Sequence, residues 1–384
     1  MKNTAIHRIN WVDGMKMNKD HFIGLEDALL QQISHSNIHA ITNNNYGLLA
    51  IEGEKGFNIQ LSLDGRNGAT ITLTNCHAIT RGGFPIQINE EITSLLELSN
   101  TTISCHKEWD KEENGLFQIV LGVSPLERIA IGSADPEEQP LRKPFVVQKY
   151  QISVVPIKQE QPEEIGIYHL TIGIIDVKNG TPNLIGDYIP PCTTVNAHTA
   201  LLEHYENFGS ALNTLEELSL KIIQKIYRKK QSNDLARMVL AITKDVQLYT
   251  SHAIPTYRMT DKYAEPASMI SRIMGLARTI QGSVNIYAGT GKEALLNYLT
   301  EWCQLNQGEF EDTLTKVSQL QYKHYHITES LHTISKCTTL LVQLFRKLEE
   351  LEYIGKKSNS KLFVKEDIIE EEKTQTTGRF FVEE

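Results

Sequence analysis

The chain has 384 residues, of which 40% are hydrophobic and 22% charged, and its formal net charge is −9. This length allows two or three domains with cores of their own, and the composition is ordinary for a soluble globular protein. The acidic balance argues against a nucleic-acid-binding protein, which would need an excess of basic charge. No apolar run approaches the ~20 residues that span a bilayer, and the N-terminus lacks the apolar core of a signal peptide.

The cysteines indicate the redox compartment, and the charge is distributed unevenly along the chain. Five cysteines are scattered along the chain and never lie at metal-ligand spacing. This pattern favours free thiols in a reducing cytoplasm. Most of the negative charge lies before residue 198, and the second half is nearly neutral. One basic cluster, residues 221–230, closes a predicted helix, where cations complement the helix dipole.

The opening of the chain predicts an extended segment, a turn and an amphipathic helix. Asp13-Gly14 is a turn dipeptide, and Asn18 is a suitable N-cap for the helix that follows. The apolar residues of this helix recur at helical spacing on one face: Phe22, Leu25, Leu29 and Ile33.

Residues 46–187 change to a strand pattern. β-branched or alternating runs are separated by Gly, Asn, Asp and Pro, which are typical turn residues. We predict strands at residues 46–52, 57–63, 69–75, 84–88, 116–123, 145–156 and 167–177. Short strands at such regular spacing favour a β-sandwich.

Residues 198–230 predict one long helix with an apolar seam, after Pro190-Pro191. The seam follows a heptad-like four-three spacing: Leu201, Tyr205, Phe208, Leu212, Leu215, Ile222 and Ile226. At 1.5 Å per residue the helix would be roughly 50 Å long, and a helix of this kind is marginal in water by itself. It therefore needs partners, which could be later helices of the same chain, sister subunits, or both.

Further helices follow in the second half. A second seam runs from Leu235 to Tyr249 and gives way to a loop around Pro255, and Pro266 opens the next helix. Thr290 and Glu293 form a predicted capping box for another helix. Residues 309–354 contain no proline or glycine and keep the four-three spacing. They predict one continuous helix of roughly 70 Å.

Few residues of the sequence suggest a catalytic, metal-binding or phosphate-binding site. His324, His326, Glu329 and His332 form a loose cluster with metal-ligand side chains, and His35 and His39 lie at helical spacing, but helix-surface and seam positions explain both sets. Gly289-Thr290-Gly291-Lys292 resembles part of a phosphate-binding loop but lacks its first glycine and its hydroxyl residue. We predict no catalytic, metal or cofactor site, and no enzyme.

The opening residues resemble the N-terminal signature of the TssK family, the baseplate subunits of type VI secretion systems. The matching pattern is Trp11-x-Asp13-Gly14-Met15-x-Met17-x-x-x-His21-Phe22. Lys19 and Asp20 stand in place of the family's Pro-Gln, and Ile23 replaces the final Gln. Further matches, in the family's order over about residues 5–285, are Tyr46-Gly47, the sequence Asp-Tyr-Ile-Pro-Pro at 187–191, Glu265-Pro266 and Leu276-Ala277.

The resemblance implies an α+β homotrimer. Residues 1–190 would be a β-sandwich shell with a leading helix, similar to the shoulder of phage receptor-binding proteins, and residues 191–306 a helical neck. In the family, the shell docks onto other baseplate wedge subunits, and a C-terminal head connects to the membrane complex. This chain departs from the family at that end, where a long helix at 307–355 and a charged, mobile tail at 356–384 are predicted. The head is therefore lost or replaced.

The resemblance also suggests site residues and partners. Trp11, Asp13, Gly14, Met15, His21 and Phe22 would face the wedge subunits, or else Trp11, Met15 and Phe22 are core residues and Gly14 serves only its turn. The seam residues would hold the neck and the trimer together.

The implied function is a structural adaptor in the cytoplasm, at the inner face of the cytoplasmic membrane. Its partners would be sister copies, wedge subunits and, through the C-terminal end, a membrane-anchor protein, with no nucleic acid, membrane insertion or cofactor. The alternatives are a phage-derived tail or receptor-binding protein outside secretion and a metal-dependent hydrolase using the cluster at 324–332.

Overall fold

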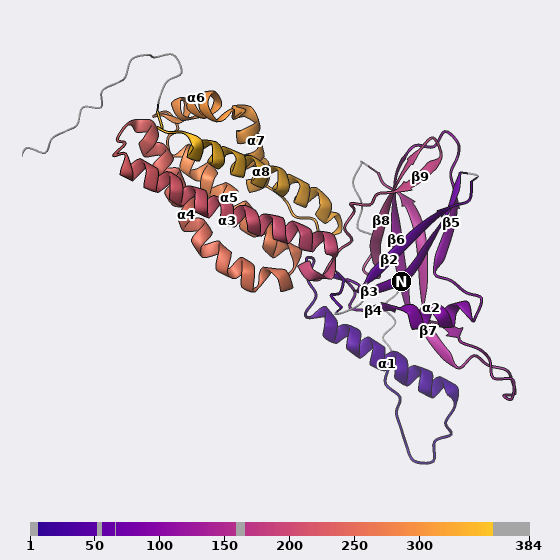
Figure 1. The fold of residues 1–384 in the computed structure, drawn as a ribbon. Helices are drawn as coiled ribbons and strands as arrows, with labels where there is room; N and C mark the ends of the chain where they lie inside the picture. The colour runs from indigo at the N-terminus through magenta and orange to yellow at the C-terminus, as the bar shows by residue number, and fades with distance from the viewer. Residues whose placement is uncertain (1–6, 52–55, 66, 159–165, 356–384) are drawn as a thin grey trace, which may run out of the picture.

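The computed structural model describes residues 7–51, 56–65, 67–158 and 166–355. The molecule is elongated, with the strands at one end and a bundle of helices at the other (Figure 1). One helix, α1 (Lys19–Ile38), lies beside the strand half, away from the bundle. The predicted α+β class is thereby confirmed.

The first sheet is built around one long strand. It contains β1 (Gly47–Leu48), β2 (Phe57–Leu63), β3 (Gly68–Ile79), β4 (Pro85–Ile88) and β5 (Ser104–Glu108). β3 pairs antiparallel with each of the other four. Side chains along β3 alternate between buried and half-buried over most of its length, so one face of the sheet is turned toward the core.

The second sheet has four antiparallel strands. Its members are β6 (Gly115–Ile131), β7 (Phe145–Pro156), β8 (His169–Lys178) and β9 (Thr181–Leu184), in the order β7-β6-β8-β9. Pairing of β6 with β7 is interrupted between Ser124 and Arg128, around Pro125, which has no N–H for the ladder. A Cβ atom on Gly173 of β8 would lie 3.7 Å from Ile59 of β2, so the two sheets pack against each other.

The sequence located most strands and missed the polar ones. β2 and β7 have the predicted bounds, whereas β5 and β9 were not predicted. β5 reads Ser-Cys-His-Lys-Glu, which lacks β-branched residues, and it forms because β3 offers a free edge there. A short helix, α2 (Glu90–Glu97), was also missed, although Asn89 caps it by accepting a hydrogen bond from the Ile92 N–H.

The helical half consists of one long helix and the helices that follow it. These are α3 (Thr199–Arg228), α4 (Asp234–Met259), α5 (Pro266–Asn285), α6 (Lys292–Cys303), α7 (Gln307–Ser318) and α8 (Ile327–Glu350). The long helix α3 packs against α4, α8 and α5. The loop predicted around Pro255 is wrong, because Pro255 lies inside α4. Its neighbours Ala253, Ile254 and Tyr257 are buried, so packing holds this stretch helical despite the proline.

The single helix predicted over residues 307–355 is also wrong. It is divided into α7 and α8, with a 3₁₀ turn, His324–His326, between them. The break contains no proline or glycine, and its cause is tertiary, because His324 is buried against the strand half. The charged tail predicted at 356–384 lies outside the described residues.

The two halves share one connected hydrophobic core. The link between them, residues 189–195, runs alongside β1, where the Leu48 N–H donates to the Pro191 carbonyl at 2.7 Å and the Thr193 N–H to the Leu48 carbonyl at 2.9 Å. The domain boundaries at 190 and 306 stay a prediction. Within the described residues, no helix is long and apolar enough to cross a membrane.

Candidate functional site

The opening segment folds as an exposed loop that leads into α1. Gly14 has φ +77°, which glycine adopts without strain, and the Met15 N–H bonds the Val12 carbonyl at 3.2 Å. Asn18 caps α1 through a reciprocal hydrogen-bond pair with His21, as the sequence predicted for the cap. The imidazole of His21 therefore helps to fix the point at which the loop ends and α1 begins.

The predicted partner-binding residues lie mostly at the surface. Trp11 is 45% exposed and Phe22 is 52% exposed, Asp13 and Gly14 are exposed, and Met15 and His21 are half-buried. The Trp11 and His21 rings lie 6.2 Å apart, so the loop folds back toward the start of α1. In the single chain, Trp11 and Phe22 are thus surface residues and not core residues.

The apolar face of α1 is also uncovered. Leu29 is 51% exposed and Ile33 is 50% exposed, and Ser34 is the one buried residue of the helix. We call the apolar side chains of the loop and of this face the α1 surface: Trp11, Val12, Met17, Phe22, Leu29 and Ile33. Scattered exposed apolar residues are normal, but a group on one helix and its leading loop is typical of a contact surface.

Polar contacts hold α1 to the strand half. The Ser34 hydroxyl donates to the Gly82 carbonyl at 2.8 Å, and the Asn37 amide donates to the Gly83 carbonyl at 3.0 Å. Arg128 of β6 forms an ion pair with Asp27 at 2.6 Å, with both side chains largely buried. A Cβ atom on Gly83 would collide with the Ser34 carbonyl, so this close approach requires glycine.

The seam of α3 is buried inside the chain. All seven predicted seam residues are buried, as is Leu218, against α4, α5 and α8. Tyr205 and Tyr257 stack with ring centroids 4.6 Å apart, and each hydroxyl donates to the other residue's carbonyl. Because the seam is occupied by helices of the same chain, a contact with sister subunits would have to use another face of α3.

A joint of hydrogen bonds connects the strand half to the helical half. His324 Nε2 lies 2.7 Å from the Tyr46 carbonyl, which can only accept, so Nε2 carries the proton. Nδ1 then accepts from the Tyr322 hydroxyl at 2.8 Å. Burial lowers the pKa of His324 to about 4, since the charged ring would lose its water. The neutral imidazole therefore acts as a fixed connector near pH 7.

Two further bonds belong to the same joint. The Ile189 N–H donates to the Thr328 hydroxyl at 3.0 Å, and the Tyr188 hydroxyl lies 3.3 Å from the Tyr325 carbonyl. Gly47 packs so closely on Pro191 that a Cβ atom there would collide with its carbonyl. Residues 187–191 resemble the TssK family in sequence, but nothing in the sequence predicts their contact with residues 322–328.

The histidines considered as possible metal ligands do not lie together in the fold. His324 serves the joint, His326 pairs with Glu329 at 3.1 Å, and His332 pairs with Asp187 at 3.4 Å. His35 and His39 are exposed. Across the part of the chain that the structure describes, three metal-ligand side chains come together only at Asp64, His106 and Glu108. The hydrolase alternative thereby loses the cluster on which it rested.

The glycine-rich turn at 289–292 leads into α6 without the predicted capping box. Gly291 is the N-cap and no side chain caps the helix, so the prediction for Thr290 and Glu293 is wrong. Lys292 pairs with Glu311 of α7 at 2.7 Å and donates to Asn285 at 2.8 Å. Lys292 therefore links the start of α6 to α7 and to the end of α5.

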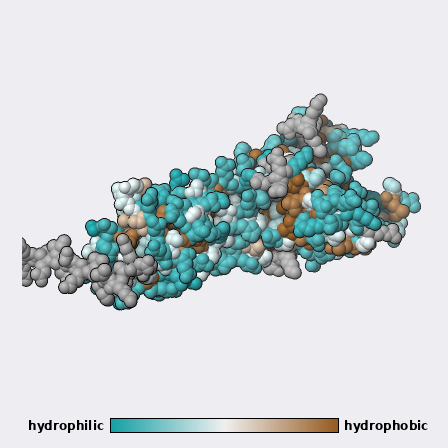
Figure 2. Space-filling view, turned by 90° about the horizontal axis from the view of Figure 1, so that it is seen from above, coloured by the Kyte–Doolittle hydropathy of each residue, from teal (hydrophilic) through white to brown (hydrophobic). Residues whose placement is uncertain are grey.

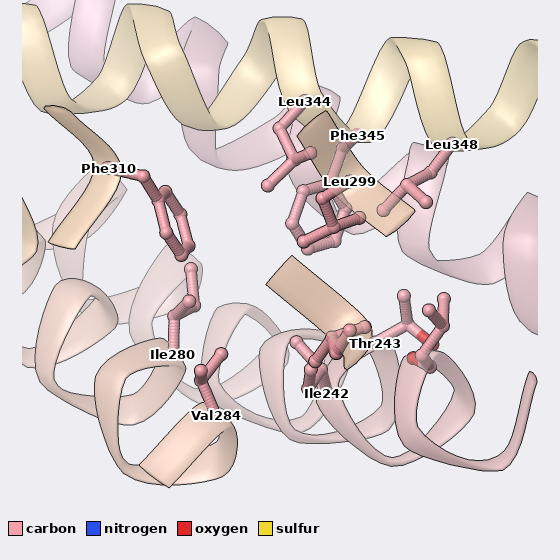
Figure 3. Close-up of a pocket in the computed structure, with 11 residues that line it drawn as sticks. Ile242, Thr243, Ile280, Val284, Leu299, Phe310, Leu344, Phe345 and Leu348 are labelled. Carbon is pink, nitrogen blue, oxygen red and sulfur yellow. The ribbon is translucent and has the colours of Figure 1, made fainter. Parts of the chain in front are cut away.

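A small cavity lies among α4 to α8 (Figure 3). Its volume is about 20 Å³, and its walls are apolar except for Thr243, whose hydroxyl donates to the Val239 carbonyl. Such a space holds at most one small group. It is a packing gap and not a ligand site.

Solved structures, but no family model or curated sequence, are similar to this chain. No family model matches the chain, and no curated protein sequence matches it. A crystal structure of TssK is similar, with 12% identity over 90% of this chain and 70% of that one, and a TM-score of 0.47. The baseplate complex from the type VI secretion system contains a similar chain, with 14% identity, coverage of 89% and 99%, and a TM-score of 0.49. The TssK-TssF-TssG baseplate subcomplex contains another, with 15% identity, coverage of 88% and 99%, and a TM-score of 0.44. These similar structures are of TssK or of type VI secretion baseplate complexes.

Proposed function

We propose that the protein is a non-enzymatic structural adaptor of a type VI secretion baseplate and that the α1 surface binds other wedge subunits. The observation that carries this proposal is the exposed apolar face of α1, together with Trp11 and Phe22 of the resembling segment. Covering six large apolar side chains would remove them from water, at roughly 25 cal/mol for each Å² buried. That is the usual chemistry of a stable protein contact.

The rest of the architecture supports an adaptor. The polar anchors of α1 and the neutral His324 joint hold the α1 surface at a set angle to a bundle of helices. A rigid connector of this kind holds the partners bound at its two ends in a fixed relative position. We propose that the two sheets form the β-sandwich shell and that three copies assemble, as the resemblance implies. The helical end would face a membrane-anchor protein at the inner face of the cytoplasmic membrane.

Co-purification with the wedge proteins of the same organism tests the α1 surface. The tagged wild-type chain should retain the wedge proteins, and Phe22→Asp and Leu29→Asp should lose them. Leu98→Asp is the matched control, because Leu98 is a 62% exposed leucine of the strand half outside the α1 surface. Retention by the two α1 variants at wild-type level would contradict the proposal.

The assembly is tested separately by mass. Light scattering after gel filtration should give three times the chain mass of 43.5 kDa. A stable monomer at micromolar concentration would contradict the trimer but would leave the α1 surface to be judged by co-purification.

A further inference from the structure

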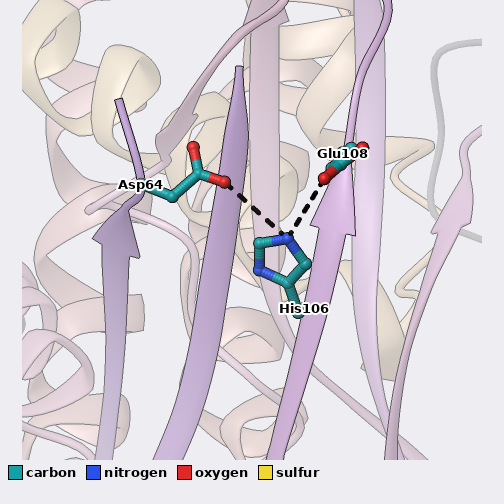
Figure 4. Close-up of side chains that lie close together, drawn as sticks. All are labelled: Asp64, His106 and Glu108. Atoms are coloured by element: carbon teal, nitrogen blue, oxygen red, sulfur yellow. Dashed lines mark ion pairs between the residues drawn. The ribbon is translucent and has the colours of Figure 1, made fainter. Parts of the chain in front are cut away.

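Three side chains with metal-ligand chemistry converge on one face of the first sheet. Asp64 follows β2, and His106 and Glu108 lie on β5. His106 Nε2 is 3.7 Å from Asp64 Oδ2 and 3.7 Å from Glu108 Oε1 (Figure 4). One ligand atom from each residue lies within 4.8 Å of the others.

The strand register explains why these residues meet. Between β2 and β5 lies β3, in which Thr70 is paired with His106 and Gly68 with Glu108. Gly68 therefore occupies the place between Asp64 and Glu108 without a side chain. A Cβ atom at this position would collide with the Asp64 carboxylate. The glycine thus leaves room for the Asp64 carboxylate to lie over β3, where its Oδ2 reaches within 3.7 Å of His106 Nε2.

Groups outside the cluster orient two of the three ligands. The Thr70 hydroxyl lies 3.1 Å from His106 Nδ1, and the Gly68 N–H donates to Asp64 Oδ1 at 3.0 Å. His106 Nε2 and Asp64 Oδ2 are thereby turned toward each other. Histidines that bind metals are commonly held in this way, with the second ring nitrogen bonded to a neighbouring oxygen, which fixes the ring and its tautomer.

We propose that Asp64, His106 and Glu108 form a binding site for a divalent transition metal of the zinc class. An imidazole nitrogen and two carboxylate oxygens are zinc ligands, at 2.0–2.2 Å from the ion. In a tetrahedral site this places neighbouring ligand atoms about 3.4 Å apart. His106 Nε2 lies 3.7 Å from each carboxylate, and the ligand atoms of all three residues lie within 4.8 Å of one another. The nitrogen ligand disfavours calcium and magnesium, which take oxygen ligands.

The exposure of the site determines which groups would complete the coordination of an ion. Because Glu108 and half of His106 face solvent, water or a partner's side chain would complete the coordination. The ion would tie the end of β2 to β5 across β3. This site is independent of the adaptor role. The competing explanation is that His106 only pairs with the two acids and binds no metal.

Calorimetric titration of the metal-free full chain with zinc chloride at pH 7.5 tests the site. We expect one zinc per wild-type chain that is missing in His106→Gln, and a zinc-dependent rise in Tm that is also missing. His332→Gln is the matched control, because His332 is an exposed histidine with one carboxylate neighbour. It should bind zinc as the wild type does.

Gly68→Ala tests the geometry while keeping all three ligands. The added methyl group displaces the Asp64 carboxylate, so zinc affinity should fall about 10- to 100-fold. If the wild type bound no zinc, the proposal would be overturned in favour of the ion pairs. Equal zinc affinity and equal Tm rise in wild type and His106→Gln would also overturn it, because the ion would then lie elsewhere. Unchanged binding by Gly68→Ala would place the ion elsewhere and would also overturn it.

Discussion

Helices α1 and α3 have the same kind of sequence pattern and opposite surroundings. Both carry apolar residues at helical spacing and both form over the predicted stretch. In α3 the apolar side is buried, whereas in α1 three of the four predicted face residues are exposed. The comparison teaches that periodicity identifies a helix and its apolar side, but not what covers that side.

The difference has a physical cause. α3 is surrounded by α4, α5 and α8, which fill its seam. α1 contacts the strand half through Ser34, Asn37 and the Arg128–Asp27 ion pair. An isolated helix of this length is marginal in water, so α1 depends on these contacts and on whatever covers its apolar face. Figure 2 shows a related contrast on another face of the molecule, where hydrophobic residues gather on the strand half and the helical half is largely hydrophilic.

The largest effect is expected in the seam of α3. Leu212→Asp removes a buried leucine and buries a charge, which should lower the free energy of unfolding by about 4 kcal/mol or more. Thermal unfolding followed by circular dichroism measures the change. Leu220→Asp on the same helix is the control, since Leu220 is 41% exposed. An equal loss in both variants would mean that seam burial does not stabilise the bundle.

The joint predicts a pH dependence. The pKa of His324 is lowered from 6.5 to about 4 in the folded chain, so its contribution is fully present above pH 6.5 and is lost as the pH falls through 4. The loss amounts to about 3 kcal/mol, from 1.36 kcal/mol per pKa unit.

Urea unfolding at pH 7 and pH 4 measures this loss. The wild type should lose about 3 kcal/mol more over this range than His324→Gln, whose amide can still donate to Tyr46. His332→Gln should follow the wild type, because His332 is exposed. The same pH slope in His324→Gln and wild type would contradict the assignment.

A smaller, local effect is expected at the base of α1. Arg128→Ala removes the ion pair with Asp27, which is largely shielded from water, and should ease opening of α1 by about 1 kcal/mol. Hydrogen exchange of the α1 amides should speed up while the bundle is unchanged. Arg142→Ala, which breaks an exposed pair with Glu138, should leave α1 unaffected.

The smallest effect on stability is expected at the α1 surface itself. Phe22→Asp should change the free energy of unfolding of the single chain by less than about 0.5 kcal/mol, because Phe22 is already exposed. Chemical unfolding of the purified wild type and variant, at equal concentration and without wedge proteins, checks this. A loss of several kcal/mol would show that Phe22 packs inside the chain and would remove the basis for the α1 surface.

Much of the fold follows from local sequence signals. Asn18 starts α1, Pro266 starts α5, α3 forms with its predicted apolar seam, and β2 and β7 have their predicted bounds. These features depend on neighbours within a few residues, such as a cap, a fixed proline φ or a repeat of apolar side chains. The opening segment was singled out correctly as the leading loop of α1, but its sequence left open whether Trp11 and Phe22 are core or surface.

Only the tertiary structure decided the remaining points. The break between α7 and α8 depends on a hydrogen bond from His324 to Tyr46, which is far away in the sequence. The exposure of the α1 face depends on the arrangement of the other elements, which leaves this face uncovered. The meeting of Asp64 with His106 depends on the register of β3 with both neighbouring strands. Local sequence sets which conformations a segment favours, but contacts between distant segments determine which side chains are buried and which ones meet.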